Sequence, residues 1–223
     1  MSWRGAAVVG ALAVPLLVAC SSTVSAVPSG REATDLVPNR PNQAVPAESS
    51  GDLTRSSLPE PTSMGPHWSY RVDPGSSEDG YRGNGTPAMA RDPQEVVGAL
   101  TPLGCRPVIL PTPKSALEVT YGHRDGTPAV GLLLEFESSD VAADFFDRRS
   151  AALRDCVDWK RATAEIDVLR DETDSFVSVR DEQVGGTPVW TEGVKRSETR
   201  VMFVAVAGAD GQDVVESALR TSS

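Results

Sequence analysis

The sequence predicts an α+β domain, in which a mostly antiparallel sheet is flanked by helices, preceded by a signal peptide and a disordered linker. Three observations lead to this fold class. Several short segments alternate apolar and polar side chains and follow one another closely, as strands joined by hairpins do. Other segments carry apolar residues three and four positions apart, as helices packed on one side do. Residues 21–91 show neither period and are rich in Ser, Pro and Gly, which is typical of a linker.

The first 20 residues have the features of a bacterial lipoprotein signal peptide. Arg4 supplies a positive charge, and residues 6–19 form an apolar stretch. The motif Leu17-Val18-Ala19-Cys20 matches the lipobox, in which the cysteine sulfur receives a diacylglycerol before cleavage. The apolar stretch is shorter than the roughly 20 residues that a membrane-spanning helix needs. We therefore expect residues 1–19 to be removed and Cys20 to be acylated; an ordinary cleaved signal peptide and an uncleaved anchor are the alternatives.

The charge of the chain restricts its partners. A formal net charge of −10 at pH 7 argues against nucleic acid, since phosphate binding needs a basic patch. It also argues against electrostatic docking on anionic lipid. Contact with the membrane would come from the acyl chains, such as palmitate, on Cys20, and more than one chain gives stable anchoring. We expect a protein anchored on the extracytoplasmic face of the cell membrane.

The cysteine content agrees with export. Once Cys20 is acylated, Cys105 and Cys156 are the remaining cysteines. Two cysteines in an oxidising compartment most simply form one disulfide. The chain-entropy model gives such a bond on the order of 4 kcal/mol of stabilisation. Two buried free thiols and a catalytic cysteine are the alternatives.

Residues 20–91 are predicted to be an acylated amino terminus followed by a disordered tether. Aliphatic residues such as Leu53 and Leu58 stand singly, so the segment cannot bury enough apolar surface to offset the entropy of ordering. The aromatic group His67-Trp68-Ser69-Tyr70 is interpreted as an incidental contact with the domain, with a short binding motif as the alternative.

The globular domain is predicted to span residues 92–223. Asp92 has the position of a helix cap, and Gly104 is expected to end that short helix just before Cys105. Alternation predicts strands over residues 116–121 and 129–137, joined by a turn at residues 123–126. A helix is predicted over residues 139–156, and its apolar face toward the sheet consists of Ala142, Phe145, Phe146, Ala152, Leu153 and Cys156.

Four more strands and a helix complete the domain. Strands are predicted over residues 164–170, 175–182 and 187–194. Residues 201–206 are apolar on both faces, which suits a central strand covered on each side. A last helix follows Asp210 and Gly211, with Val214, Val215, Ala218 and Leu219 on one face.

Catalytic and metal-binding motifs are missing from the sequence. It contains no Gly-x-Ser-x-Gly elbow and no Gly-x-x-x-x-Gly-Lys phosphate loop. Of its two histidines, His123 lies next to a turn and is interpreted as a surface residue rather than a base. The acidic turn at residues 171–174 lacks the ligand spacing of a calcium loop. Trp159 and Trp190 are assigned to packing, with a pocket as the alternative. No catalytic residue, metal or cofactor is predicted.

Two segments resemble a known family. Phe136-Glu137-Ser138-Ser139-Asp140, continued through the helix to Cys156-Val157-Asp158-Trp159, is similar to the central segment of the PknH-type sensor domain. This is the extracellular domain of mycobacterial serine/threonine kinases of that type, and it also occurs in actinobacterial lipoproteins. Residues 200–220 fit the ending of that family. The resemblance implies an antiparallel sheet flanked by helices with a cleft, and a non-catalytic role in binding an unidentified ligand.

The functional expectation is a tethered module whose globular domain binds or senses a small molecule, a glycan or an envelope partner. Two alternatives stay open. One is an extracytoplasmic hydrolase of the cell envelope that uses acidic residues. The other is a lipid carrier, which needs a large apolar cavity.

Overall fold

The computed structural model describes residues 45–72, 75–76, 81–82, 84–102, 104–182 and 189–221. The predicted signal peptide and Cys20 therefore lie outside the described residues. In the part of the chain that is described, no helix is both long and apolar enough to span a membrane.

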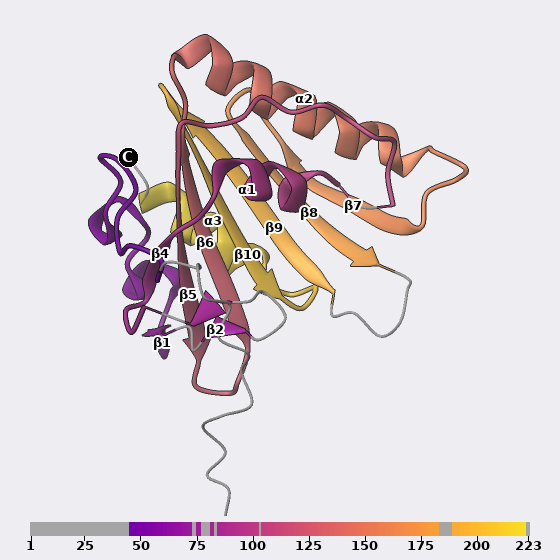
Figure 1. The fold of residues 1–223 in the computed structure, drawn as a ribbon. Coiled ribbons are helices and arrows are strands. Elements are labelled where there is room, and N and C mark those ends of the chain that lie inside the picture. Colours follow the sequence, from indigo (N-terminus) through magenta and orange to yellow (C-terminus); the bar gives the residue numbers. More distant parts are fainter. Residues whose placement is uncertain are drawn as a thin grey trace, which may run out of the picture. The chain divides into compact units, whose positions relative to one another are not determined.

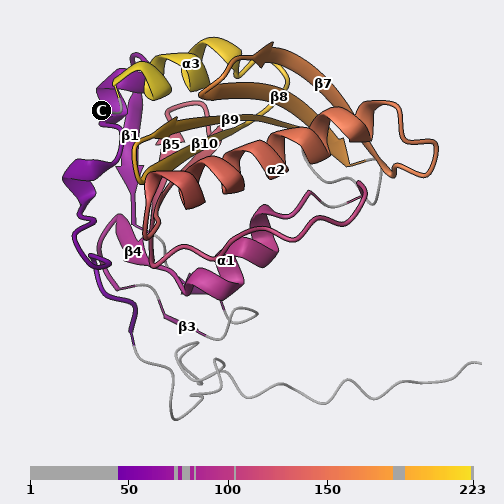
Figure 2. The same cartoon turned by 90° about the horizontal axis from the view of Figure 1, so that it is seen from above.

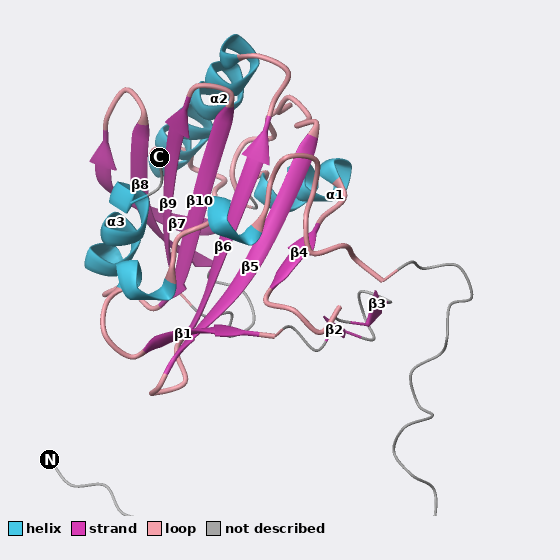
Figure 3. Cartoon of the chain, turned by 90° about the vertical axis from the view of Figure 1, so that its left-hand side faces the viewer, coloured by secondary structure: helices cyan, strands magenta, loops and turns pink. Residues whose placement is uncertain are grey.

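An eight-stranded antiparallel sheet organises these residues (Figure 1). The strand order is β1-β5-β6-β10-β9-β8-β7. β4 also pairs with β5, along residues 117–119, whereas β1 pairs along residues 120–123. Figure 3 shows β8, β9, β10, β6 and β5 side by side in this order. The strands are β1 (Trp68–Arg71), β4 (Ala88–Ala90), β5 (Ser115–His123), β6 (Pro128–Glu135), β7 (Ala164–Asp171), β8 (Ser175–Glu182), β9 (Trp190–Ser197) and β10 (Arg200–Ala207). A separate pair is formed by β2 (Gly75–Ser76) and β3 (Tyr81–Arg82).

Helices cover both faces of this sheet, so the α+β fold class is confirmed. The helices α1 (Pro93–Leu100) and α2 (Ser139–Val157) lie on one face, and α3 (Gln212–Thr221) lies on the other (Figure 2). We call these the α2 face and the α3 face.

The starts of α1 and α2 follow the capping residues of the sequence. The Asp92 carboxylate accepts hydrogen bonds from the backbone N–H groups of Gln94 and Glu95, at 2.8 and 3.2 Å. Ser138 Oγ accepts one from Val141 N at 3.3 Å. Both caps satisfy N–H groups that have no partner inside the helix.

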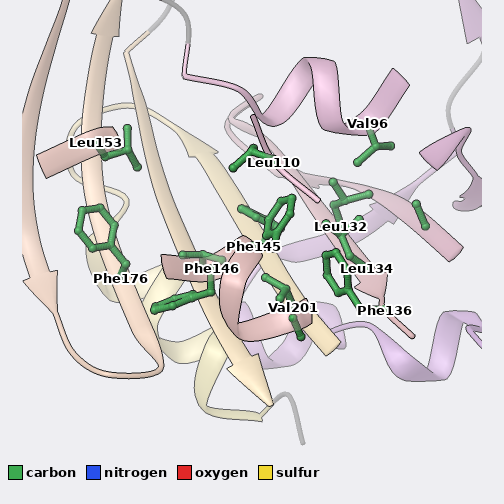
Figure 4. Close-up of a cluster of buried hydrophobic side chains, with 14 of the residues drawn as sticks. Val96, Leu110, Leu132, Leu134, Phe136, Phe145, Phe146, Leu153, Phe176 and Val201 are labelled. Atoms are coloured by element: carbon green, nitrogen blue, oxygen red, sulfur yellow. The ribbon is translucent and has the colours of Figure 1, made fainter. Parts of the chain in front are cut away.

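The core of the α2 face is built from aromatic and aliphatic side chains (Figure 4). The Phe145 ring lies 5.1 Å from that of Phe136 and 6.0 Å from that of Phe203. All the apolar α2 residues predicted to face the sheet are buried. Cys105 and Cys156 form a disulfide, as predicted, and it connects the exit of α1 to the end of α2.

Two glycines let bulky groups approach the α3 face. A Cβ on Gly193 of β9 would overlap the side chain of Val215 and lie 2.8 Å from Leu219 Cδ1, both on α3. A Cβ on Gly131 of β6 would lie 3.1 Å from the ring of Tyr121. Glycine at these positions therefore lets α3 pack closely on β9 and lets the Tyr121 ring of β5 lie over β6.

The predicted domain boundary at Asp92 is wrong, because earlier residues belong to the fold. β1 and β4 are strands of the main sheet, and Leu53, Leu58 and Met64 are at most 4% exposed. Residues 50–66 cross the α3 face with two 3₁₀ turns, Arg55–Ser57 and Pro61–Met64. The apolar residues of this segment pack against the sheet one by one, although their spacing follows neither a helical nor a strand period.

Two further differences concern strands. β9 begins at Trp190 and ends at Ser197, later in the chain than predicted, and residues 187–188 lie outside the described ranges. β5 is buried on both faces rather than half-buried, since Ala116 and Leu117 are both fully covered. The prediction for β10 is confirmed, because it lies between β6 and β9.

Candidate functional site

The candidate site is a pocket of about 370 Å³ on the α3 face. It lies where β6 ends, β10 begins and β9 ends. We call it the Glu135 pocket. Its lining residues come from these three strands, the β9–β10 turn and the segment that crosses the α3 face: Ser57, Leu133, Glu135, Lys195, Ser197, Glu198, Thr199, Arg200 and Met202.

Strand register brings the side chains of this pocket together. Arg200 of β10 is the partner of both Glu135 on β6 and Ser197 on β9. Two residues further along β10, Met202 is the partner of Leu133 and of Lys195. Because side chains two positions apart share a face of a sheet, these two rows lie next to each other on the α3 face.

Glu135 is the central chemical feature of the pocket. Its side chain is only 9% exposed. Lys114 Nζ lies 3.6 Å from Oε2, and Arg200 Nη2 lies 3.7 Å from Oε1, which is beyond hydrogen-bonding distance. No described residue donates a hydrogen bond to Oε2. A buried carboxylate oxygen without a donor is rare in folded proteins, and a bound molecule can supply that donor.

The charged residues that line the pocket are balanced in number. Glu135 and Glu198 supply two carboxylates, while Lys195 and Arg200 supply two cations. Lys195 Nζ donates a hydrogen bond to Leu219 O at 2.9 Å, which holds the ammonium group beside the end of α3. A neutral molecule with both donors and acceptors suits such a lining better than a simple ion does.

The remaining walls add hydroxyl groups and an apolar floor. Ser57, Ser197 and Thr199 carry the hydroxyls, and Leu133 and Met202 form the floor. Ser57 belongs to the segment that the sequence assigns to the tether. Its hydroxyl accepts a hydrogen bond from Thr54 N at 3.3 Å, which holds this wall in place.

The residues singled out in the sequence lie elsewhere. Cys20 is outside the described residues, and the disulfide belongs to the α2 face. His123 is only partly exposed and pairs with Asp125 rather than lying free on the surface. Trp159 lines a shallow depression with Arg106 and Arg154, outside the Glu135 pocket.

Asp171, in the acidic turn, forms two hydrogen bonds with Arg154, at 2.7 and 3.0 Å. Within the described ranges, no three His, Cys, Asp or Glu side chains converge in the manner of metal ligands.

One sequence signal points to the Glu135 pocket. Leu132, Leu133 and Leu134 form an unbroken apolar run, which is typical of a strand buried on both faces. Glu135 continues the face that Leu133 occupies, so a charged residue falls where burial is expected. The contributions of Lys195 and Ser57 have no such signal, because they depend on strand order and on the path of the 50–66 segment.

Comparison with known proteins gives little further information. No protein-family model matches the chain, and no curated protein matches it. A solved structure, the extracellular domain of PknH from Mycobacterium tuberculosis, matches with a TM-score of 0.35 and 10% sequence identity. The match covers 48% of this chain and 64% of the PknH chain, which is less than two thirds of it. A similarity of this size places the chain in no family and transfers no function to it.

Proposed function

We propose that this protein is a lipid-anchored extracytoplasmic module that binds a small hydroxylated molecule, such as a sugar unit, without transforming it. In this proposal residues 1–19 are removed, Cys20 carries the lipid, and the ligand occupies the Glu135 pocket. The single observation that carries the proposal is the buried carboxylate of Glu135, which lines a pocket and whose Oε2 has no hydrogen-bond donor among the described residues.

The chemistry of the pocket suits hydroxyl groups. A ligand hydroxyl can donate to Glu135 Oε2, and hydrogen bonds to an ionised group are among the stronger ones. The N–H groups of Lys195 and Arg200 can donate to other ligand oxygens. Leu133 and Met202 offer an apolar surface to the carbon skeleton, as in most small-molecule sites.

The same lining bears on the alternatives. A lipid carrier needs an apolar cavity, whereas four charged residues line this pocket of about 370 Å³. Hydrolysis is the second candidate, since Glu135 and Glu198 place two carboxylates in one pocket, the residue type that glycosidases use. The Cys105–Cys156 disulfide supports the extracytoplasmic location, because disulfides persist in oxidising compartments.

Lipid anchoring is tested by mass spectrometry of the protein purified from its native membrane. We expect an amino-terminal peptide that begins at Cys20 and carries the mass of a diacylglycerol. A chain that begins at Met1 with an unmodified Cys20 would contradict the anchoring, but it would leave the pocket untouched.

Ligand binding is tested by calorimetric titration of the full-length protein with glucose, N-acetylglucosamine and inositol. We expect at least one of them to bind, and Glu135→Gln to weaken that binding about ten-fold, since the charged acceptor is worth about 1.5–3 kcal/mol. Glu137→Gln is the matched control, because Glu137 is exposed and lies outside the pocket.

The result is negative if none of the three compounds binds, or if Glu135→Gln binds as the wild type does. Release of a free sugar from a β-linked disaccharide by the wild type, abolished in Glu135→Gln, would favour the hydrolase instead.

A further inference from the structure

A second pocket, of about 500 Å³, lies at the other end of the α3 face. It is formed where β1 begins, where the β5–β6 hairpin turns and where β10 leads into α3. It shares no lining residue with the Glu135 pocket. We call it the Trp68 pocket, and its chemistry is independent of the function proposed above.

An indole ring forms one wall of this pocket. Trp68 of β1 is the register partner of His123 on β5, and their rings lie 5.3 Å apart at 45°. The His67 ring lies 6.0 Å from that of His123, so both histidines of the chain meet here. His67 adopts a φ of 70°, a left-handed conformation that is uncommon outside glycine. His67 directly precedes β1, whose first residue is Trp68.

The charge of the Trp68 pocket is negative. Asp125 and Asp210 line it, and neither a lysine nor an arginine is among its described lining residues. The Glu135 pocket, in contrast, balances two carboxylates with two cations. An aromatic face beside uncompensated carboxylates is the environment that proteins use for organic cations.

Asp125 is held in a fixed position. It accepts hydrogen bonds from Thr127 N and from His123 Nδ1, both at 2.9 Å and both at Oδ1. These bonds lower the pKa of Asp125 below its ordinary value, the one from the Thr127 backbone most. A carboxylate only accepts hydrogen bonds, so His123 donates the proton on Nδ1 in this contact. Asp125 thus keeps its charge, and Oδ2 takes no part in either bond.

We infer that the Trp68 pocket binds an organic cation, an alkylammonium or guanidinium group, over the Trp68 indole with Asp125 and Asp210 as its counter-charges. The cation gains from the ring and from both carboxylates at once. The same group can arrive as a free small molecule or as the side chain of a partner protein, and the probes below separate these sources.

The test is a nuclear magnetic resonance titration of the full-length protein that follows its indole N–H signals. The Trp68 signal is identified as the one lost in Trp68→Phe. Methylguanidinium and tetramethylammonium chloride are the probes, with sodium chloride at equal ionic strength and tert-butanol, a neutral analogue of tetramethylammonium, as controls. We expect a saturable shift of the Trp68 signal with the two organic cations only.

Substitutions of the two aspartates test whether they are the counter-charges of the bound cation. Asp125→Asn and Asp210→Asn should each weaken binding about three-fold, as expected for one exposed charge. Asp167→Asn, an exposed acid on β7, is the matched control and should leave the affinity unchanged. The inference is overturned if tert-butanol shifts the Trp68 signal as the cations do, or if both pocket variants bind like the wild type.

A peptide probe, acetyl-Gly-Arg-Gly-amide, identifies the source of the cation. Binding about ten-fold tighter than that of methylguanidinium supports a partner protein, because backbone contacts then add to the affinity. Equal affinity supports a free small cation. Failure of all three probes would remove the Trp68 site and would leave the Glu135 pocket unaffected.

Discussion

The two faces of the sheet are covered in different ways, and the difference bears on function. The α2 face is packed mainly by one helix of 19 residues, with α1 and the disulfide at its side. The α3 face is covered by a helix of 10 residues and by the irregular chain of residues 50–66. The Glu135 and Trp68 pockets both open on the α3 face. Residues of the irregular cover line both pockets, Ser57 the first and Met64 and Pro66 the second.

The buried polar groups of the two faces differ as well. Under α2, Glu192 binds Arg149 and Arg180, each with an N–O distance of 2.8 Å. Arg149 also lies over the Phe203 ring at 4.9 Å and donates to Leu100 O at 3.3 Å. A buried charge network of this kind fixes the position of α2, because breaking one contact leaves an uncompensated charge in the core.

The α3 face has ion pairs too, such as Arg170 with Glu216 of α3 at 2.9 Å, but beneath the segment of residues 50–66 it presents tyrosines. Tyr121 is fully buried and donates a hydrogen bond from its hydroxyl to Pro59 O at 2.6 Å. The Tyr70 ring stacks on it at 5.5 Å, and the Arg55 guanidinium lies over Tyr70 at 5.3 Å. The segment of residues 50–66 is therefore attached by its buried apolar side chains, by aromatic packing and by hydrogen bonds at Ser50 and Pro59.

The largest difference in stability that we expect between the two faces comes from the disulfide, which lies on the α2 face only. Cys105→Ala combined with Cys156→Ala should lower the free energy of unfolding by about 4 kcal/mol, since the bond closes a long loop of chain. Urea unfolding of the variant and of the wild type measures the difference. Reduction of the wild type should give the same loss.

The same double variant sharpens the comparison of the faces. Below the unfolding transition, its affinity for a ligand of the Glu135 pocket should equal that of the wild type, because no residue of that pocket belongs to the core that the disulfide joins. A loss of affinity in the folded variant would show that the two faces are coupled.

The α2 face was predictable because its residues obey a period. Phe145, Phe146 and Leu153 recur at helical spacing and are buried as expected. The placement of β10 followed from its apolar character on both sides. Arg149 and Ser150 were not expected in the core, since charge and polarity argue against burial unless a partner such as Glu192 is known.

The α3 face was not predictable in the same way. Leu53 and Leu58 have no period, because a chain with 3₁₀ turns can bring single side chains to a sheet at any spacing. Composition predicts a tether because Leu53 and Leu58 are too few to form a core with one another. In the structure they pack against the sheet instead. The two pockets depend on register across strands that are distant in sequence, such as Arg200 with Glu135, and no local pattern reports that pairing.

The smaller expected effect is a loss of stability at alkaline pH that originates on the α3 face. Burial raises the pKa of Tyr70 to about 12, and it raises the pKa of Tyr121 further. In the unfolded chain both hydroxyls titrate near pH 10. Their contribution to stability is complete below pH 10 and is lost as the pH rises above it, because only the unfolded state then releases the protons. Urea unfolding at pH 8, 10 and 11 should show a decrease, with about 1 kcal/mol at pH 11 due to Tyr121.

Tyr121→Phe separates this loss from other alkaline effects. The variant should be less stable than the wild type at pH 8, because Pro59 O loses its donor, at a cost of about 1–2 kcal/mol. Above pH 10 its stability should decline less steeply, since one titrating hydroxyl is gone while the lysines and arginines are unchanged. Parallel declines of the two proteins would mean that Tyr121 is as accessible in the folded state as in the unfolded one. The 50–66 segment would then not be held on the sheet, and the wall that Ser57 gives to the Glu135 pocket would be lost with it.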